Sequence, residues 1–220
     1  MAHGNPSSLL DFERDLLSRG IARAAGIDEV GRGPLAGPVA AAAVVLPPDW
    51  IRAGLPPELH GLTDSKRLAP ARRERFAAFL LACPHVQQAV VFVEVGEIDR
   101  LNILRATQVA MRRAIAVLAP APQHLLVDGL PVPDLPAPQT ALVGGDARSA
   151  SIAAASVLAK VARDRRMNDY DRTWPDYGFA EHKGYPTARH RAVLARLGPC
   201  PIHRRSFAPV RDHPVLPLAP

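Results

Sequence analysis

Several apolar segments of the sequence end on acidic residues. In chain order these acids are Asp28 with its neighbour Glu29, then Asp128 and Asp146. A carboxylate at the end of a buried segment costs free energy unless it is paired or binds a metal ion, and neighbouring carboxylates repel one another. A hard divalent cation such as Mg²⁺ would offset both penalties, because it prefers oxygen ligands. One such acid alone is more often a helix cap or a turn residue, so it is the set that favours a metal site.

The segment after the adjacent pair, "GRGPLAG" at 31–37, is a glycine-rich turn. Successive side chains of a regular strand point to opposite faces, so Asp28 and Glu29 can share a site only if the strand bends or ends there. Gly31 and Gly33 supply the freedom for a bend and bring backbone N–H groups close to the site. The turn lacks the GK[ST] of a P-loop, and Pro34 interrupts its match to a dinucleotide-binding fingerprint.

Apolar runs and turn residues predict alternating strands and helices around these acids. The predicted strands are 22–28, 37–46, 85–95, 124–128 and 139–146, and the predicted helices are 9–19, 70–82, about 17 residues beginning near 101, 149–174 and 188–197. The first two strands are joined by too few residues for a crossover, so we expect them to be antiparallel. The pattern predicts an α/β domain with a mixed sheet and helices on both faces.

Composition and charge limit the class of protein. The chain has 220 residues, a formal net charge of +6 and a pI of about 10, which favours a polyanionic partner over the alternative of a basic enzyme without one. Cys83 and Cys200 are isolated and support neither a disulfide framework nor a zinc site. The first 20 residues contain no signal-peptide core, and the Ala/Val run after Gly33 is interrupted by prolines. We therefore expect a cytoplasmic protein with no membrane segment.

Motifs spread over residues 26–210 resemble those of bacterial ribonuclease HII and occur in the same order. They read "GIDEVGRGPLAGPV", "DSKRL", "EIDRLNIL", "VDG", "GGDARSASIAAASVLAKVARDR", "YGFAEHKGYPT" and "HRRSFAPV". The resemblance implies a ribonuclease H-like fold with a mixed five-stranded sheet flanked by helices and a helical C-terminal part. It also implies metal-dependent cleavage of RNA in RNA–DNA hybrids and at single ribonucleotides in duplex DNA, which leaves 5′-phosphate and 3′-hydroxyl ends. Leu130 and Ala162 depart from residues common in the family, and neither is one of the acids.

The resemblance also assigns roles to individual residues. Two Mg²⁺ or Mn²⁺ ions would be held by the four acids named above. The backbone of Gly31, Arg32 and Gly33 would sense the ribose 2′-hydroxyl, and Tyr185 would pack against the deoxyribose that follows the junction. Apart from the resemblance, the candidates for phosphate contacts are Lys66, Lys160, Lys183, Arg204 and Arg205, although each alone is more often a solvated surface cation. Lys66, Ser156 and Lys160 lie within the family motifs and are expected to contact the substrate. His182 and His203 are expected to be packed polar groups.

We divide the sequence into four parts. They are an N-terminal helical segment at 1–20, a catalytic domain at 21–170, a helical substrate-binding part at 171–210 and a Pro-rich tail at 211–220. The family suggests a monomer acting in the cytoplasm on nucleic acid duplexes. Two alternatives are another ribonuclease H-like nuclease, such as a type 1 enzyme or a DNA resolvase, and a non-catalytic nucleic-acid binder that kept the fold.

Overall fold

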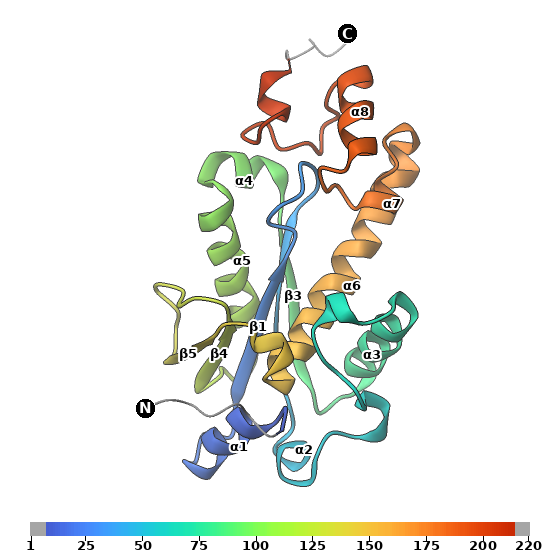
Figure 1. Cartoon of the computed structure of the whole chain (residues 1–220). Helices are drawn as coiled ribbons and strands as arrows, with labels where there is room; N and C mark the ends of the chain where they lie inside the picture. Colours follow the sequence, from blue (N-terminus) through green and yellow to red (C-terminus); the bar gives the residue numbers. More distant parts are fainter. Residues whose placement is uncertain (1–7, 214–220) are drawn as a thin grey trace.

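One mixed sheet organises the chain, as seen in a computed structural model that describes residues 8–213 (Figure 1). Its five strands lie in the order β3-β2-β1-β4-β5. Their bounds are β1 Ala24–Val30, β2 Val39–Val45, β3 Gln87–Val93, β4 His124–Asp128 and β5 Gln139–Leu142. The β1–β2 and β2–β3 pairs are antiparallel, whereas β4 runs parallel to both β1 and β5. The predicted mixed sheet and the antiparallel first pair are confirmed.

Helices cover both faces of this sheet, as predicted. The helices of the described residues are α1 Asp11–Ser18, α2 Pro48–Ala53, α3 Pro70–Ala82, α4 Val95–Leu101, α5 Ile103–Val117, α6 Ala150–Thr173, α7 Phe179–His182 and α8 Ala188–Leu197. Figure 1 shows α5 and α6 on opposite sides of the central strands, and both helices pack against β2. Among residues 8–213, no helix is both long and apolar enough to span a bilayer.

Strand β2 belongs to two hydrophobic cores because it is buried on both faces. Val39, Ala41 and Ala43 pack in the core that contains α5, and Ala42 and Val44 pack in the core that contains α6. This alternation follows from the two-residue period of a strand. A fully buried strand therefore reads in the sequence as a continuous apolar run, which makes it recognisable.

Helix α6 lies unusually close to β1, and small residues make the approach possible. A Cβ added at Gly26 would lie 2.1 Å from the backbone carbon of Ser151, so only glycine fits at this point of the strand. Glu13 of α1 reaches the start of the same helix, where one carboxylate oxygen accepts hydrogen bonds from the Ser149 hydroxyl and from both the N–H and the hydroxyl of Ser151. An acid at a helix N-terminus satisfies free N–H groups and interacts favourably with the helix dipole.

Some predicted boundaries were wrong. The segment 139–146 is not one strand, because β5 ends at Leu142 and Gly144 turns the chain with a φ of +64°. The helix predicted near 101 is preceded by another, α4, and the two are separated at Asn102, where φ is +69°. The side chain of Asn102 accepts a hydrogen bond from the N–H of Arg105 and so starts α5 as a new helix.

The division into parts stays a prediction. The proposed boundary at 170/171 lies inside α6, so a single helix runs from the predicted catalytic domain into the predicted C-terminal part. Most of the Pro-rich tail at 211–220 lies outside the described residues, as do the first seven residues of the N-terminal segment.

The C-terminal part packs around a chain of buried histidines. The Cys200 N–H donates to His203 Nδ1 (3.0 Å), the Nε2 atoms of His203 and His190 lie 3.1 Å apart, and His190 Nδ1 lies 2.9 Å from the Tyr185 carbonyl oxygen. Because that carbonyl can only accept, His190 carries its proton on Nδ1, and His203 then donates from Nε2. Both rings are therefore neutral, which agrees with the expectation that His203 is a packed polar group. His182 is also buried, as expected.

We predict that this histidine chain makes the fold sensitive to acid. Burial lowers the pKa of His190 to about 4 and that of His203 to about 3, and the charge of His182 adds to the first shift and that of His190 to the second. Above pH 6.5 both histidines are neutral in the folded and unfolded states, but below it the unfolded chain binds protons first, so their contribution to stability decreases as the pH falls. In an NMR titration of the folded protein, both ring signals should stay those of neutral imidazole at pH 5. A midpoint near 6.5 for either ring would contradict the assignment.

Candidate active site

The register of two parallel strands places two carboxylates side by side. Ile27 of β1 pairs with Val127 of β4, so the next positions are Asp28 and Asp128. Asp146 comes from a short 3-10 helix, Gly145–Ala147, that lies between β5 and α6. The N–H of Gly145 donates to Asp128 Oδ1 at 2.6 Å, which fixes this turn against the end of β4. The three acids therefore converge from distant parts of the sequence.

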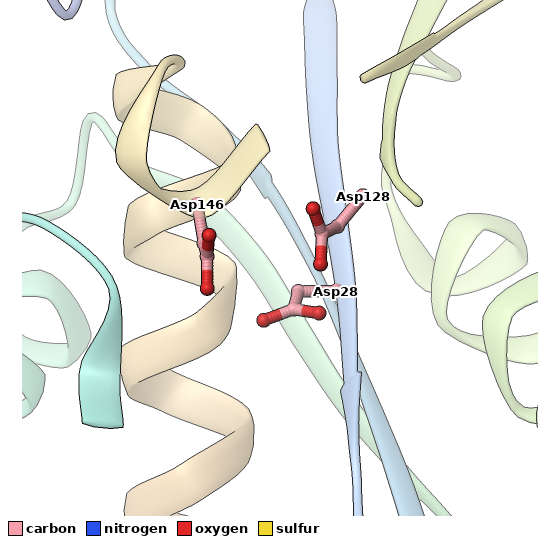
Figure 2. Close-up of side chains that lie close together, drawn as sticks. All are labelled: Asp28, Asp128 and Asp146. Atoms are coloured by element: carbon pink, nitrogen blue, oxygen red, sulfur yellow. The ribbon is translucent and has the colours of Figure 1, made fainter. Parts of the chain in front are cut away.

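One oxygen from each of these three carboxylates lies within 4.8 Å of the other two (Figure 2). Figure 2 shows the side chains of Asp28, Asp128 and Asp146 pointing toward one another across the space between β1, β4 and the start of α6. Only Asp128 lies at the end of its strand. Asp28 lies inside β1, which continues to Val30, and Asp146 lies beyond β5, so the expectation that every acid closes a strand was wrong in detail.

Glu29 is the fourth predicted ligand, and its carboxylate is not part of this three-acid cluster. Its side chain forms an ion pair with Arg32, with 3.5 Å between Oε1 and Nη1. It nevertheless lines the same cavity as Asp28 and is close enough to Asp128 for that charge to affect its pKa. A site that includes Glu29 would need its side chain to turn from Arg32 toward the three aspartates.

The acids raise one another's proton affinity. Burial raises the pKa of Asp28 well above the ordinary range of an aspartate, and the charges of Glu29 and Asp128 add to the shift. Burial and the charge of Asp128 also raise the pKa of Asp146 to about 6. For Glu29, burial raises the pKa, and the opposing effect of Arg32 does not cancel it. Asp128 contributes to all three shifts, so it is the centre of the repulsion.

A cavity of about 370 Å³ opens beside the cluster. Two predicted metal ligands, Asp28 and Glu29, line it. So do four residues predicted to contact the substrate and two that were not predicted; these are Lys66, Ser156, Lys160 and Tyr185, and Val30 and Ser65. The Ser65 hydroxyl accepts a hydrogen bond from the Ser156 hydroxyl at 2.9 Å. Nothing in the sequence marks Ser65 apart from its place in "DSKRL".

The predicted cations differ in how free they are. Lys66 is exposed, and Asp64, Asp28 and Asp146 raise its pKa against the effect of burial. Lys160 donates to Asp164 at 2.8 Å, so part of its charge is neutralised within the protein. Arg204 is fully buried and bonded to backbone carbonyls, so the prediction that it contacts a phosphate was wrong.

The predicted specificity residues are brought together. Arg32 and Gly33 are exposed, and a methyl group added at Gly33 would come within 4 Å only of Tyr185, with 3.8 Å to Cε1. Tyr185 is 37% exposed, and its ring lies against the guanidinium of Arg163, 5.9 Å from the ring centre. The "GRG" turn and the tyrosine therefore form adjacent parts of one surface at the mouth of the acidic site.

The donor set fits a hard divalent cation. All its atoms are carboxylate oxygens, and among residues 8–213 no histidine or cysteine joins the cluster. Such a set matches Mg²⁺ or Mn²⁺ and does not match the nitrogen and sulfur ligands that Zn²⁺ prefers. A cation would also remove the repulsion that raises the pKa values of these acids.

The family described as Ribonuclease HII matches residues 25–210 of the chain. The chain belongs to the ribonuclease HII family. It is 56% identical to a ribonuclease HII of Moorella thermoacetica over 91% of this chain and 93% of that protein, and 55% identical to one of Geobacillus thermodenitrificans over 93% and 75%. The chain is therefore a ribonuclease H, an endonuclease.

Solved structures agree with this family assignment. A ribonuclease H2 from Pyrococcus horikoshii OT3 superimposes with a TM-score of 0.71 and 27% identity, covering 86% of this chain and 96% of that one. A ribonuclease HIII in complex with Mn²⁺ has a TM-score of 0.65 over 96% of this chain and 74% of that one; at 20% identity it supports the fold alone. The predicted ribonuclease H-like fold is thereby confirmed.

Replacing Asp128 by asparagine should show both how much the acidic cluster destabilises the fold and whether it binds cations. The asparagine side chain can still accept from the Gly145 N–H but removes the charge that raises the pKa of the neighbouring acids. Without divalent cations we expect Asp128→Asn to melt at the same temperature as the unmodified chain or higher. Mg²⁺ at about 100 times its Kd should stabilise the unmodified chain by about 2.7 kcal/mol and the variant far less.

Thermal unfolding in EDTA and in Mg²⁺ measures both effects. Asp134→Asn is a matched control, because Asp134 is an exposed acid in the same β4–β5 connection and adopts a φ of +57° that asparagine tolerates. It should respond to Mg²⁺ as the unmodified chain does. Equal stabilisation of Asp128→Asn and the control by Mg²⁺ would show that the cluster is not the cation site.

Proposed function

We propose that the protein cleaves the RNA strand of RNA–DNA hybrids and cleaves on the 5′ side of ribonucleotides embedded in duplex DNA. The products would carry 5′-phosphate and 3′-hydroxyl ends, which suits a role in removing ribonucleotides during DNA replication and repair. The observation that carries this proposal is the acidic cluster of Asp28, Asp128 and Asp146, which lies beside the surface formed by the "GRG" turn and Tyr185. Membership of the ribonuclease HII family supports it.

In this proposal the acids act as ligands. Asp28, Asp128 and Asp146 would hold Mg²⁺ or Mn²⁺, with Glu29 as a fourth ligand once its side chain leaves Arg32. A pair of such ions, when bound, supplies an activated water and stabilises the charge on the leaving 3′-oxygen. The protein's own contribution is to keep the carboxylates in place: Gly145 N–H holds Asp128, and the N–H of Glu29 donates to Asp28 at 2.7 Å.

Recognition of the sugar would use the surface next to these ligands. The 2′-hydroxyl is what distinguishes a ribonucleotide from its neighbours in DNA. Exposed N–H groups of the "GRG" turn would bind that hydroxyl, and the Tyr185 ring would pack against the next sugar, where a second 2′-hydroxyl would clash. The distance of 3.8 Å between a methyl group at Gly33 and Tyr185 Cε1 supports simultaneous contact with two adjacent nucleotides.

The remaining substrate contacts would be electrostatic. Lys66, Ser156 and Lys160 line the cavity and are proposed to contact the cleaved strand, and Lys183 and Arg205 are candidates for phosphates outside it. The net charge of +6 supports binding of a polyanion, with an affinity that decreases as salt increases. We further propose that the protein acts as a monomer in the cytoplasm.

The central test is cleavage of a labelled DNA duplex that contains one ribonucleotide. With Mg²⁺ we expect a single cut on the 5′ side of the ribonucleotide, and with EDTA no cut. Asp128→Asn should lower the rate by at least about 100-fold while the protein stays folded, and Asp134→Asn should cleave normally. An uncut duplex that is nevertheless bound would favour the non-catalytic nucleic-acid binder. Cleavage of continuous hybrids only would contradict the proposed action on single ribonucleotides.

A second test addresses Tyr185. Because Tyr185→Ala removes the ring proposed to pack against the sugar, it should lower kcat/KM on the single-ribonucleotide duplex by about tenfold, which corresponds to about 1.4 kcal/mol. Tyr185→Phe keeps the ring and loses only the hydroxyl, so it should retain most of the activity. Steady-state kinetics of the two variants on the same duplex measures the difference. Equal rates for Tyr185→Ala and the unmodified chain would exclude a stacking role.

A further inference from the structure

Arg204 is a buried cation whose partners are backbone carbonyls. Its side chain has no exposed surface, and no carboxylate of the described residues forms a salt bridge with it. Its guanidinium donates to the carbonyl oxygens of Gly31 (2.6 Å), Arg32 (2.9 Å) and Gly37 (3.0 Å). All three carbonyls belong to the turn between β1 and β2. Because burying a charge costs free energy, packing alone does not explain an arginine at this position.

A second buried cation, Arg163 of α6, binds the same turn. It donates to the carbonyl oxygens of Pro38 (2.9 Å), Ala36 (3.2 Å) and Lys183 (3.1 Å), the last of which lies two residues before Tyr185. Burial, together with the charge of Arg163, lowers the pKa of Arg204 to about 9, which shows how close the two cations are. The turn and the tyrosine segment are thus connected through one set of charge-assisted hydrogen bonds.

The contacts of Arg204 fix the direction of two N–H groups, because each carbonyl that it binds shares a peptide plane with the N–H of the next residue. In a planar trans peptide the C=O of one residue and the N–H of the next point in opposite directions. Because the carbonyls of Gly31 and Arg32 point inward to Arg204, the N–H groups of Arg32 and Gly33 point away from it. Arg32 and Gly33 are exposed, so these N–H groups face the side where the proposed substrate lies.

We propose that Arg204 is a positioning residue that sets the sugar specificity of the enzyme by holding the Arg32 and Gly33 N–H groups toward the substrate. This inference deepens the proposed function and rests on it. Arg204 does not touch the nucleic acid; it acts through the two peptide groups that it binds. Arginine suits this task because its rigid planar fork reaches several acceptors at once, whereas the lysine ammonium is a point charge on a flexible stem.

Binding to two duplexes tests the proposal in the unmodified chain and in Arg204→Lys. The duplexes are identical except that the central nucleotide is ribo in one and deoxy in the other, and EDTA prevents cleavage. We expect the unmodified chain to prefer the ribo duplex. In Arg204→Lys this preference should fall about tenfold, a factor that corresponds to 1.4 kcal/mol, with affinity for the deoxy duplex unchanged. Arg211→Lys is the matched control, an exposed arginine of the same C-terminal segment, and should keep the preference.

The possible results distinguish failure of the positioning role of Arg204 from failure of the proposed function. If the unmodified chain shows a preference that Arg204→Lys keeps in full, the positioning role is wrong and the proposed function stands. If the unmodified chain shows no preference, sensing of the 2′-hydroxyl fails and the positioning role fails with it. An equal loss of affinity for both duplexes would mean that Arg204 is merely structural, which also overturns the proposal.

Amide hydrogen exchange on the unmodified chain decides the matter if Arg204→Lys does not fold. The N–H groups of Arg32 and Gly33 should exchange readily in the free protein and become protected by the ribo duplex but not by the deoxy duplex. Slow exchange of both groups in the free protein would mean that they point inward, contrary to the proposal.

Discussion

The parallel register of β1 and β4 places Asp28 beside Asp128, and the rest of the site depends on that one placement. The ladder of hydrogen bonds between the two strands fixes the backbone positions from which these two carboxylates extend. Burial raises the pKa values of Asp28 and Asp146 most, and the charge of Asp128 raises both further. A cation that bound at this site would relieve the repulsion between the carboxylates, and this would add to its binding free energy.

Helix α6 connects the three aspartates with the surface formed by the "GRG" turn and Tyr185. Its first turn follows Asp146, Ser156 and Lys160 in its N-terminal half lie along the cavity, and Arg163 near its midpoint binds the turn after β1. The close approach of this helix to Gly26 explains the small residues of its early face. Because a helix is stiff along its axis, the distance between the metal ligands and the "GRG" turn is fixed by one element.

The sequence pattern anticipated the acids better than the groups that support them. An apolar segment that ends on Asp128 is visible in the sequence, because burial leaves a compositional trace. Asp146 was found although β5 ends earlier, since the intervening turn is short. Ser65 and the contacts of Arg204 could not be predicted, because a buried arginine is rare and looks in the sequence like any surface cation. That the "GRG" turn lies next to Tyr185 came only from the resemblance to a family.

The two buried charge clusters of the site are compensated in different ways. In the proposed function the aspartates would be compensated by cations from solution, which can be removed, whereas the charges of Arg163 and Arg204 are compensated by carbonyl dipoles that belong to the chain. The turn between β1 and β2 is therefore held by hydrogen bonds from the chain's own side chains. Arg32 lies in this turn and pairs with Glu29, the acid outside the three-carboxylate cluster. A substrate group that displaced Arg32 from Glu29 would allow Glu29 to turn toward the proposed cation site. Substrate binding and cation binding would then be coupled through this ion pair.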